Sequence, residues 1–434
     1  MKMKIVITVA FVAAGLMGLH LLHGSPQQEV WIGIREGVPM IPVALPDFQF
    51  GKNSMVDTAT KNELYETLWQ DLSFSRVFKM VPREQYGYIG RFDPGQIRFR
   101  DWASIQAKIL ISGELEVSES GRIVFAFKVY EVESEKFIFG RNFGGKKEFL
   151  RLFAHRTADE MMKYFGERSL FTSKIVFVSK RDDNDELYIM DYDGKRQRRI
   201  TYNDYIDGFP AWSADNEKIV FTSYRSKTPD LYLFHLYTGK TDLLSRGGTN
   251  YSADWSPEGN QLAYTSTKAG NAEIYVRDMA TGKERRLTFN RAIDTTPCWS
   301  PSGREIAFTS QRGGTPQIYI MDAEGANVRR ITYEGTYHDS PRWSPDGTRI
   351  AYVSRVEYRF DIYVYNLKTN AIVKLTERAG RNENPTWSPD GRHLIFSSTR
   401  SGVYQLYVVD YDGANLRRLT SSGENKMPRW QKKV

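Results

Sequence analysis

The residues best suited to chemistry recur at one fixed position in the C-terminal part of the chain. Asp, Asn or His stands five residues before each of six regularly spaced tryptophans, at Asp207, Asn250, Asp294, His338, Asn382 and Asn425. These side chains could converge on a hard cation such as Ca²⁺, or could present polar anchors to a partner protein. Alternatively, Asp and Asn make the turns before each tryptophan, because their side chains mimic backbone turns.

The next position carries side chains that turn chemistry does not explain. These residues are Gly208, Tyr251, Thr295, Asp339, Glu383 and Lys426. Aromatic and charged side chains are typical anchors of protein interfaces. The predicted partner-binding rim comprises Asp207, Asn250, Tyr251, Asp294, Thr295, His338, Asp339, Asn382, Glu383 and Lys426. We expect exposed loop positions here, with Tyr251, His338, Asp339 and Glu383 as the main anchors.

The elements that must position this rim follow from the tryptophan repeat. The tryptophans at 212, 255, 299, 343, 387 and 430 are 43 or 44 residues apart, and WSPDG-like turns follow the first five. Each unit has four short β-branched and aromatic runs bounded by turn residues, which predicts one four-stranded propeller blade. Residues 174–434 are therefore predicted to form a six-bladed β-propeller. Pro428–Trp430 should supply the missing inner strand of the first blade, because no other tryptophan run precedes it.

Strand order predicts which face carries the rim. The chain enters the propeller near Lys174 and leaves at Gln431, and both points should lie on the face of the WSPDG turns. We expect the preceding domain to attach near that face. The opposite face, which carries the loops before each tryptophan strand, should then be free for a partner.

Catalytic motifs are absent from the sequence. No G-x-S-x-G pentapeptide, glycine-rich phosphate loop or cysteine-based metal site occurs, and the histidines lack metalloprotease spacing. We expect His155 to pack or to cap a helix rather than to bind a metal. The sequence thus predicts a binding protein without a cofactor. The alternatives are a propeller hydrolase or lactonase with a metal in the central channel, and a carbohydrate binder that uses Tyr205, Tyr251 and Tyr337.

The first part of the chain does not repeat. Residues 1–24 are expected to form a secretory signal peptide, with Lys2 and Lys4 before an apolar run. A retained anchor is the alternative, because Leu22-His23-Gly24 is not a clean small-x-small cleavage site. Residues 29–166 are expected to form a small α/β domain, so the chain is mainly β overall. Its predicted strands are Val30–Ile34, Ile41–Ala44, Ile109–Leu115 and Arg122–Glu131, and its predicted helices are Thr58–Leu72 and Glu148–Phe165.

Charge and cysteine content narrow the function further. The chain has 60 Lys and Arg against 52 Asp and Glu, with no basic run long enough to favour nucleic acid. Cys298 is the only cysteine, so an exported chain would have no intramolecular disulfide. We expect Cys298 to be buried beside Trp299.

Four segments are distinctive beside the WSPDG repeats: Glu29–Gly37 (EVWIGIREG), Leu68–Tyr86, Asp101–Leu115 and Leu152–Glu167. Together with the repeats, they resemble the TolB family, the periplasmic component of the Tol-Pal system of Gram-negative bacteria. The helix that contains Ala154-His155-Arg156 is the most specific of them.

The resemblance implies a non-enzymatic interaction protein of the periplasm. It implies that the propeller binds the lipoprotein Pal, with other outer-membrane lipoproteins as further candidates, and that partners provide the only link to a membrane. It also implies that an N-terminal segment, residues 25–37, contacts TolA through Glu29, Val30, Ile32 and Ile34. The implied roles are outer-membrane integrity and invagination of the outer membrane during cell division.

Overall fold

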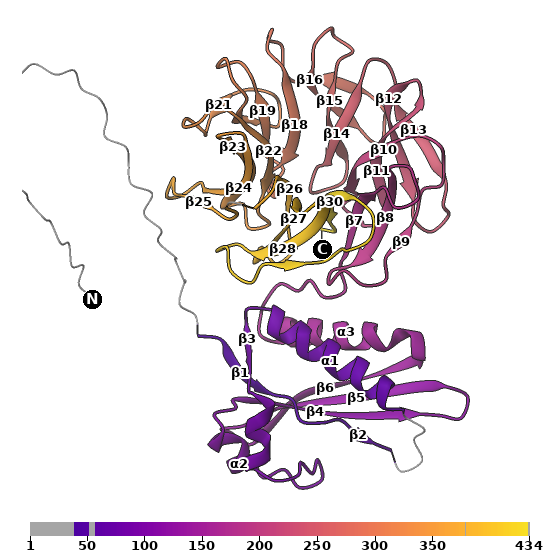
Figure 1. The fold of residues 1–434 in the computed structure, drawn as a ribbon, viewed down its shortest axis with the longest axis vertical. Coiled ribbons are helices and arrows are strands. Elements are labelled where there is room, and N and C mark those ends of the chain that lie inside the picture. Colours follow the sequence, from indigo (N-terminus) through magenta and orange to yellow (C-terminus); the bar gives the residue numbers. More distant parts are fainter. Residues whose placement is uncertain (1–38, 52–56, 378, 433–434) are drawn as a thin grey trace, which may run out of the picture. The chain divides into compact units, whose positions relative to one another are not determined.

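The computed structural model describes residues 39–51, 57–377 and 379–432. These residues form a six-stranded mixed sheet with helices, followed by six four-stranded antiparallel sheets (Figure 1). The predicted fold class, a six-bladed β-propeller preceded by a small α/β domain, is confirmed. The predicted signal peptide, the segment 25–37 and the strand Val30–Ile34 lie outside the described residues.

The mixed sheet has the order β3-β1-β4-β5-β6, with β2 paired to β4. Its strands are β1 (Ile41–Ala44), β2 (Gln49–Phe50), β3 (Phe78–Met80), β4 (Ile109–Val117), β5 (Arg122–Glu131) and β6 (Lys136–Lys146). Its helices are α1 (Thr58–Phe74), α2 (Phe99–Ser104) and α3 (Leu150–Tyr164), with short 3₁₀ turns η1 (Arg83–Tyr88) and η2 (Lys147–Phe149). Strand β1 pairs in parallel with β3 and with β4, and β2 pairs in parallel with β4. Strands β4, β5 and β6 form an antiparallel meander.

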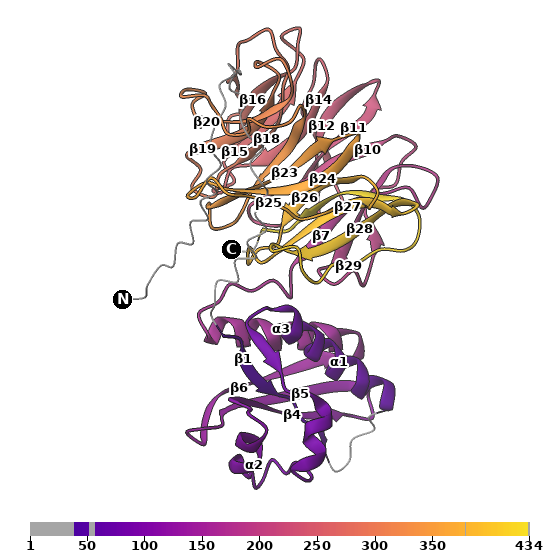
Figure 2. The same ribbon diagram turned by 60° about the vertical axis from the view of Figure 1, so that its left-hand side comes forward.

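Two apolar clusters cover the two faces of this sheet. Ile109 and Ile111 of β4 pack against apolar residues of α1 and α3 on one face, where the two helices lie together (Figure 2). The alternate residue Leu110 packs against Trp102 of α2 on the other face, as the period of two in a strand requires. Asp57 fixes the start of α1, because its Oδ1 accepts a hydrogen bond from Thr60 N at 2.6 Å.

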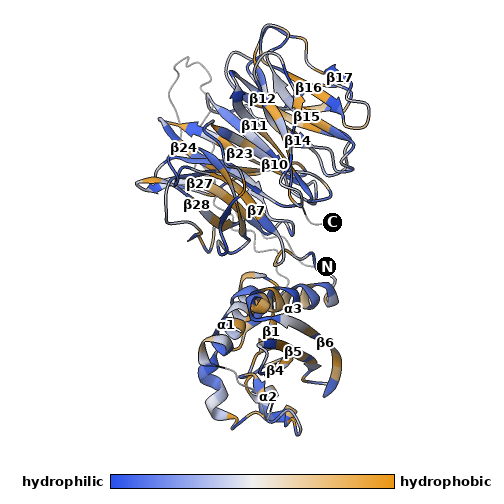
Figure 3. Cartoon of the chain, turned by 90° about the vertical axis from the view of Figure 1, so that its right-hand side faces the viewer, coloured by the Kyte–Doolittle hydropathy of each residue, from blue (hydrophilic) through white to orange (hydrophobic). Residues whose placement is uncertain are grey.

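Each blade has an inner strand that ends at the repeated tryptophan. The inner strands are β10 (Asp207–Trp212), β14 (Asn250–Trp255), β18 (Asp294–Trp299), β22 (His338–Trp343), β26 (Asn382–Trp387) and β30 (Asn425–Trp430). The second strands are β7 (Lys174–Ser179), β11 (Lys218–Ser226), β15 (Gln261–Ser266), β19 (Glu305–Ser310), β23 (Arg349–Val356) and β27 (His393–Ser401). Apolar residues concentrate along these strands, and polar residues dominate the loops (Figure 3).

The two outer strands complete each blade. The third strands are β8 (Glu186–Asp191), β12 (Thr228–His235), β16 (Glu273–Asp278), β20 (Gln317–Asp322), β24 (Arg359–Asn366) and β28 (Val403–Asp410). The fourth strands are β9 (Arg198–Arg199), β13 (Thr241–Ser245), β17 (Glu284–Arg286), β21 (Arg329–Arg330), β25 (Ile372–Lys374) and β29 (Arg417–Arg418).

The last strand of the chain closes the ring, as predicted. The first blade has the order β30-β7-β8-β9, with Trp430 paired to Ile175 and Lys426 to Val178. The Trp430 side chain is buried, and its Nε1 donates to Ser173 Oγ at 2.8 Å. Closure therefore pairs the β7 edge, which would otherwise be exposed.

Every inner strand contains a β-bulge three residues before its tryptophan. The register shifts there in all six blades. The residues at this position have positive φ, between 50° and 57°, although none is glycine: Phe209, Ser252, Thr296, Ser340, Asn384 and Met427. A bulge re-aims the neighbouring side chains, so it decides the direction of the predicted rim residues.

The mixed sheet and the propeller contact each other beside a WSPDG turn. Phe74 of α1 stacks on His393, which follows the turn of the sixth blade, with 3.9 Å between ring centroids. Arg76 forms ion pairs with Asp410 and Asp412 of the same blade. These contacts agree with the expected attachment near the WSPDG face.

Candidate functional site

The first residue of each inner strand is buried rather than exposed. Asp207, Asn250, Asp294, Asn382 and Asn425 have no exposed side-chain surface, and His338 is buried as well. The prediction that these are exposed loop positions is therefore wrong. The bulge lies between this residue and the tryptophan that ends the strand. The side chain of this residue contacts neighbouring polar groups.

Asn382 shows what this position does. Its Oδ1 accepts from Ser398 Oγ at 2.7 Å and from Arg400 Nη2 at 2.9 Å within its own blade. Its Nδ2 donates to Asp361 Oδ1 at 3.0 Å in the preceding blade. Asn425 repeats the pattern with Gln405 and Arg181. The asparagines at this position thus link adjacent blades, and each also donates to a carbonyl oxygen three residues earlier, which agrees with the turn-forming alternative.

The buried carboxylates of the rim pair with arginines. Asp294 accepts from Arg312 Nη2 at 2.8 Å and from Asn290 Nδ2 at 2.6 Å. Asp207 accepts from Asn203 Nδ2 at 2.8 Å, and burial raises its pKa although Arg225 lies 3.6 Å away. Among the residues that the structure describes, no group of three potential metal ligands lies at the rim. The arrangement gives no support to a Ca²⁺ site there.

His338 is also held internally. Its Nε2 contacts the carbonyl oxygen of Glu334, and its ring packs edge-on against Tyr352. Burial lowers the pKa of His338, which favours the neutral imidazole. His338 is therefore a packed turn residue, and it is not suited to anchor a partner from this position.

The second position remains partly accessible in five of the six inner strands. Tyr251, Thr295, Asp339, Glu383 and Lys426 are all half-buried, whereas Gly208 is buried. Burial and the nearby Asp339 raise the pKa of Tyr251 to about 12, so these two residues from different blades approach each other. Five blades thus contribute one accessible side chain each to a mixed aromatic and charged rim.

Hydrogen bonds hold the accessible rim in shape. Asp339 accepts from Thr309 Oγ1 at 2.8 Å and from Tyr337 OH at 3.2 Å. Glu383 pairs with Arg381 at 2.8 Å and accepts from Tyr404 OH. Lys426 pairs with Asp185 at 3.0 Å. These side chains are oriented before any partner arrives, which reduces the entropic cost of binding.

Exposed apolar residues lie on the same face as this rim, and sequence reasoning missed most of them. The loop before an inner strand is bonded to the end of the second strand, as in Tyr224 N to Ile206 O at 3.1 Å, so both segments share one face. The exposed apolar residues of these segments are Tyr205, Ile206, Tyr224, Ile293, Val356, Tyr358 and Val403. Aligning the six repeats and comparing the loop before each inner strand with the loop after each second strand could have identified these apolar residues.

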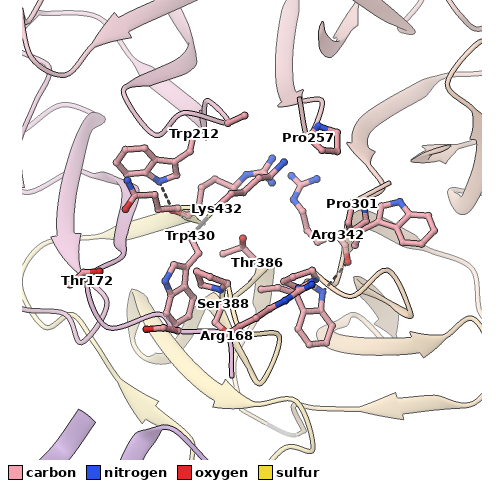
Figure 4. Close-up of a pocket in the computed structure, with 18 of the residues that line it drawn as sticks. Arg168, Thr172, Trp212, Pro257, Pro301, Arg342, Thr386, Ser388, Trp430 and Lys432 are labelled. Atoms are coloured by element: carbon pink, nitrogen blue, oxygen red, sulfur yellow. Dashed lines mark hydrogen bonds between the residues drawn. The ribbon is translucent and has the colours of Figure 1, made fainter. Parts of the chain in front are cut away.

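A cavity of about 1090 Å³ lies at the other end of the channel, beside the WSPDG turns. Its walls include five of the six repeated tryptophans and the prolines of the WSPDG-like turns, and Arg342 and Lys432 point toward its centre (Figure 4). Burial and the neighbouring Arg342 lower the pKa of Arg429 to about 9. The residue before each tryptophan lines this cavity in all six blades: Ala211, Asp254, Cys298, Arg342, Thr386 and Arg429.

This cavity lacks an activated thiol. Cys298 is buried, as predicted, and burial raises the pKa of its thiol. A reactive cysteine needs a lowered pKa and some exposure. The cavity was not predicted from the sequence, although the residues that precede the six tryptophans, which line it, recur at one fixed position in the repeat.

Comparison with known protein families shows the family to which the chain belongs. A family profile described as the TolB beta propeller domain matches residues 161–362 and 338–433. A second profile, the TolB amino-terminal domain, matches residues 32–138. The chain belongs to the TolB family.

Individual TolB proteins are similar over large parts of this chain. The Tol-Pal system protein TolB of Desulfosudis oleivorans is 36% identical over 216 residues, which are 48% of this chain and 49% of that protein. The TolB of Ruegeria sp. is 32% identical over 254 residues, 56% of this chain and 57% of that protein. The chain thus spans about half the length of these curated relatives.

A solved TolB structure extends the similarity to both parts of the chain. The crystal structure of TolB from Acinetobacter baumannii matches with a TM-score of 0.78 and 25% identity, over 91% of this chain and 98% of that one. The TolB architecture is therefore present in both the mixed sheet and the propeller.

None of the helices in the described part of the chain has the length and apolar character needed to cross a membrane.

Proposed function

We propose that this chain is the periplasmic, non-enzymatic TolB component of a Tol-Pal system. In this role it binds Pal through the propeller face that carries the accessible rim, and it contacts TolA through residues 25–37. Other outer-membrane lipoproteins are further candidate partners. Through these partners it would support outer-membrane integrity and invagination of the outer membrane at division.

One observation supports the Pal-binding face above all. Tyr251, Thr295, Asp339, Glu383 and Lys426 come from five different blades and are accessible on the face opposite the WSPDG turns. Ile206 and Tyr358, on the same face, are exposed apolar side chains. Aromatic and charged anchors together with exposed apolar side chains on one face favour a protein-binding surface.

The enzymatic alternative finds little support at the rim. A lactonase-type site needs carboxylates and a histidine converging on one ion, but Asp207 and Asp294 pair with arginines. His338 turns toward the backbone of Glu334. The carbohydrate-binding alternative would need free aromatic faces, yet Tyr337 packs edge-on against Phe360 and Tyr251 packs against Phe209.

Binding of purified Pal to rim variants tests the proposal. Glu383→Lys and Tyr251→Ala should each weaken Pal binding by about 1–3 kcal/mol in isothermal titration calorimetry, if either is a central anchor. The control is Asp346→Ala in a WSPDG turn, where Asp346 Oδ1 accepts from Thr348 N at 3.0 Å. The control should lower stability and leave Pal affinity unchanged. Loss of Pal binding in the control, with Pal binding unchanged in both rim variants, would show that the Pal site is assigned to the wrong face of the propeller.

A truncation tests the TolA contact separately. Val30, Ile32 and Ile34 are β-branched and lie two residues apart, a spacing suited to adding a strand to a sheet edge. Removal of residues 25–36 should abolish TolA binding in a pull-down and leave the thermal unfolding of the propeller unchanged. Full TolA binding by the truncated chain would contradict this part of the proposal.

A further inference from the structure

A cluster of potential metal ligands lies where helix α3 meets the first blade. His155 of α3, Asp191 at the end of β8 and Asp193 in the following turn each offer one ligand atom, and these atoms lie within 4.8 Å of one another. It is the one such cluster among the residues that the structure describes. His155 and Asp191 are each 3% exposed, and Asp193 is half-buried. The cluster is thus largely shielded from water.

Two ligand atoms in this cluster lack a hydrogen-bond partner. His155 Nε2 and Asp191 Oδ2 are both buried and make no hydrogen bond within the described structure. Buried polar atoms are normally satisfied, because leaving them without a partner costs desolvation energy that nothing returns. A bound cation would satisfy both atoms together.

The other side of the imidazole is fixed in a way that suits metal binding. His155 Nδ1 lies 2.8 Å from Asp71 Oδ2, and Asp71 is buried and also accepts from Tyr192 OH. Asp71 Oδ2 therefore occupies the Nδ1 side of the ring, so Nε2 is the imidazole nitrogen left for a metal ion. Metal-binding histidines typically donate their second ring N–H to a carboxylate in this manner.

The salt bridges around the cluster leave one buried carboxylate oxygen available. Lys174 pairs with Asp191 through Oδ1, and Arg151 pairs with Asp193. Asp191 Oδ2 has no hydrogen-bond partner in the described structure, so a divalent cation could bind it without displacing Lys174.

The ligand set selects the kind of metal. One imidazole nitrogen and two carboxylates are typical of Zn²⁺ and its neighbours, whereas Ca²⁺ and Mg²⁺ prefer all-oxygen sites with more ligands. We propose that His155, Asp191 and Asp193 form a site for a zinc-like divalent transition-metal ion. The ion joins α3 to the first blade and leaves its remaining coordination position to water.

Calorimetric titration of the EDTA-treated, dialysed protein with ZnCl₂ tests this site. Wild-type protein should bind one Zn²⁺ per chain, and CaCl₂ at the same concentration should give no saturable heat. His155→Gln, which can still donate to Asp71, should lose this binding, and Asp193→Asn should weaken it at least tenfold. His235→Ala is the matched control, because His235 lies in a half-exposed pair with Asp242 and should be dispensable.

A spectroscopic arm covers the case in which His155→Gln does not fold. Wild-type protein loaded with one equivalent of CuCl₂ should show nitrogen coupling from a single imidazole in its electron paramagnetic resonance spectrum. Zn²⁺ should also raise the melting temperature of wild type and His235→Ala. Unchanged Zn²⁺ affinity in both His155→Gln and Asp193→Asn, absence of stoichiometric Zn²⁺ binding, or a Cu²⁺ spectrum without imidazole nitrogen would each overturn the proposal.

Discussion

Trp430 carries the most direct test of ring closure. Its side chain is 4% exposed, and its strand β30 is the only partner of β7 on that edge. Burial of roughly 200 Å² at about 25 cal/mol per Å² is worth about 5 kcal/mol. Large-to-small core substitutions of tryptophan cost about 3–5 kcal/mol. We therefore expect Trp430→Ala to lower the free energy of unfolding by about 3–5 kcal/mol.

A pair of phenylalanine variants separates the hydrogen bond from the packing. Trp430→Phe keeps most of the ring but loses the bond from Nε1 to Ser173 Oγ, worth about 1 kcal/mol. Trp343→Phe is the matched control, because Trp343 Nε1 is buried without a hydrogen-bond partner in the described structure. The first variant should be less stable than the second by about 1 kcal/mol.

Equilibrium urea unfolding followed by circular dichroism measures both effects. Deletion of residues 425–434 should have a larger effect than any substitution, because it exposes the β7 edge and promotes aggregation. A Trp430→Ala protein that unfolds at the wild-type urea midpoint would refute the assignment of β30 to the first blade.

Two further predictions concern stability. Asn382→Ala should cost about 2–3 kcal/mol, because Ser398, Arg400 and Asp361 each lose a hydrogen bond to it. Glu383→Ala, at the half-buried neighbour, should cost less than about 1 kcal/mol. The reverse order of urea midpoints would contradict the assigned burial. Burial alone would raise the pKa of Asp410, but bonds from His393 and Asn415 and the charge of Arg76 hold it below its usual 3.8. This lowered pKa stabilises the fold above pH 3.8, and the contribution is lost as the pH falls through the folded-state pKa. The melting temperature of Asp410→Asn should therefore lie below wild type at neutral pH and approach it in acid, and a constant difference would exclude this linkage.

The sequence was sufficient for the parts of the fold that repeat or have a strong period. The tryptophan spacing predicted the blades and their closure, and β1 and β5 have the predicted bounds, Ile41–Ala44 and Arg122–Glu131. Strand β6 was missed because Gly140, Gly144 and Gly145 weaken its strand pattern. Its pairing along the whole length of β5 overrides that local preference.

The direction of the rim side chains was harder to predict. Positive φ at Phe209 or Met427 has no local signal, because glycine is the residue expected in that conformation. The bulge nevertheless separates a buried residue such as Asn382 from an accessible one such as Glu383. Likewise, spacing alone does not reveal that His155 meets Asp191, because that contact depends on how a helix packs against a blade.

The closing strand also has a mechanical consequence. Strand β7 is the first element after the linker, and it is bonded along one edge to β30 and along the other to β8. Tension that reaches the propeller from the N-terminal side is delivered along the length of β7. The hydrogen bonds on both edges then bear the load together in shear, instead of opening one after another as in a peeled strand. The point at which the first and last strands of the propeller meet is therefore built to withstand pulling.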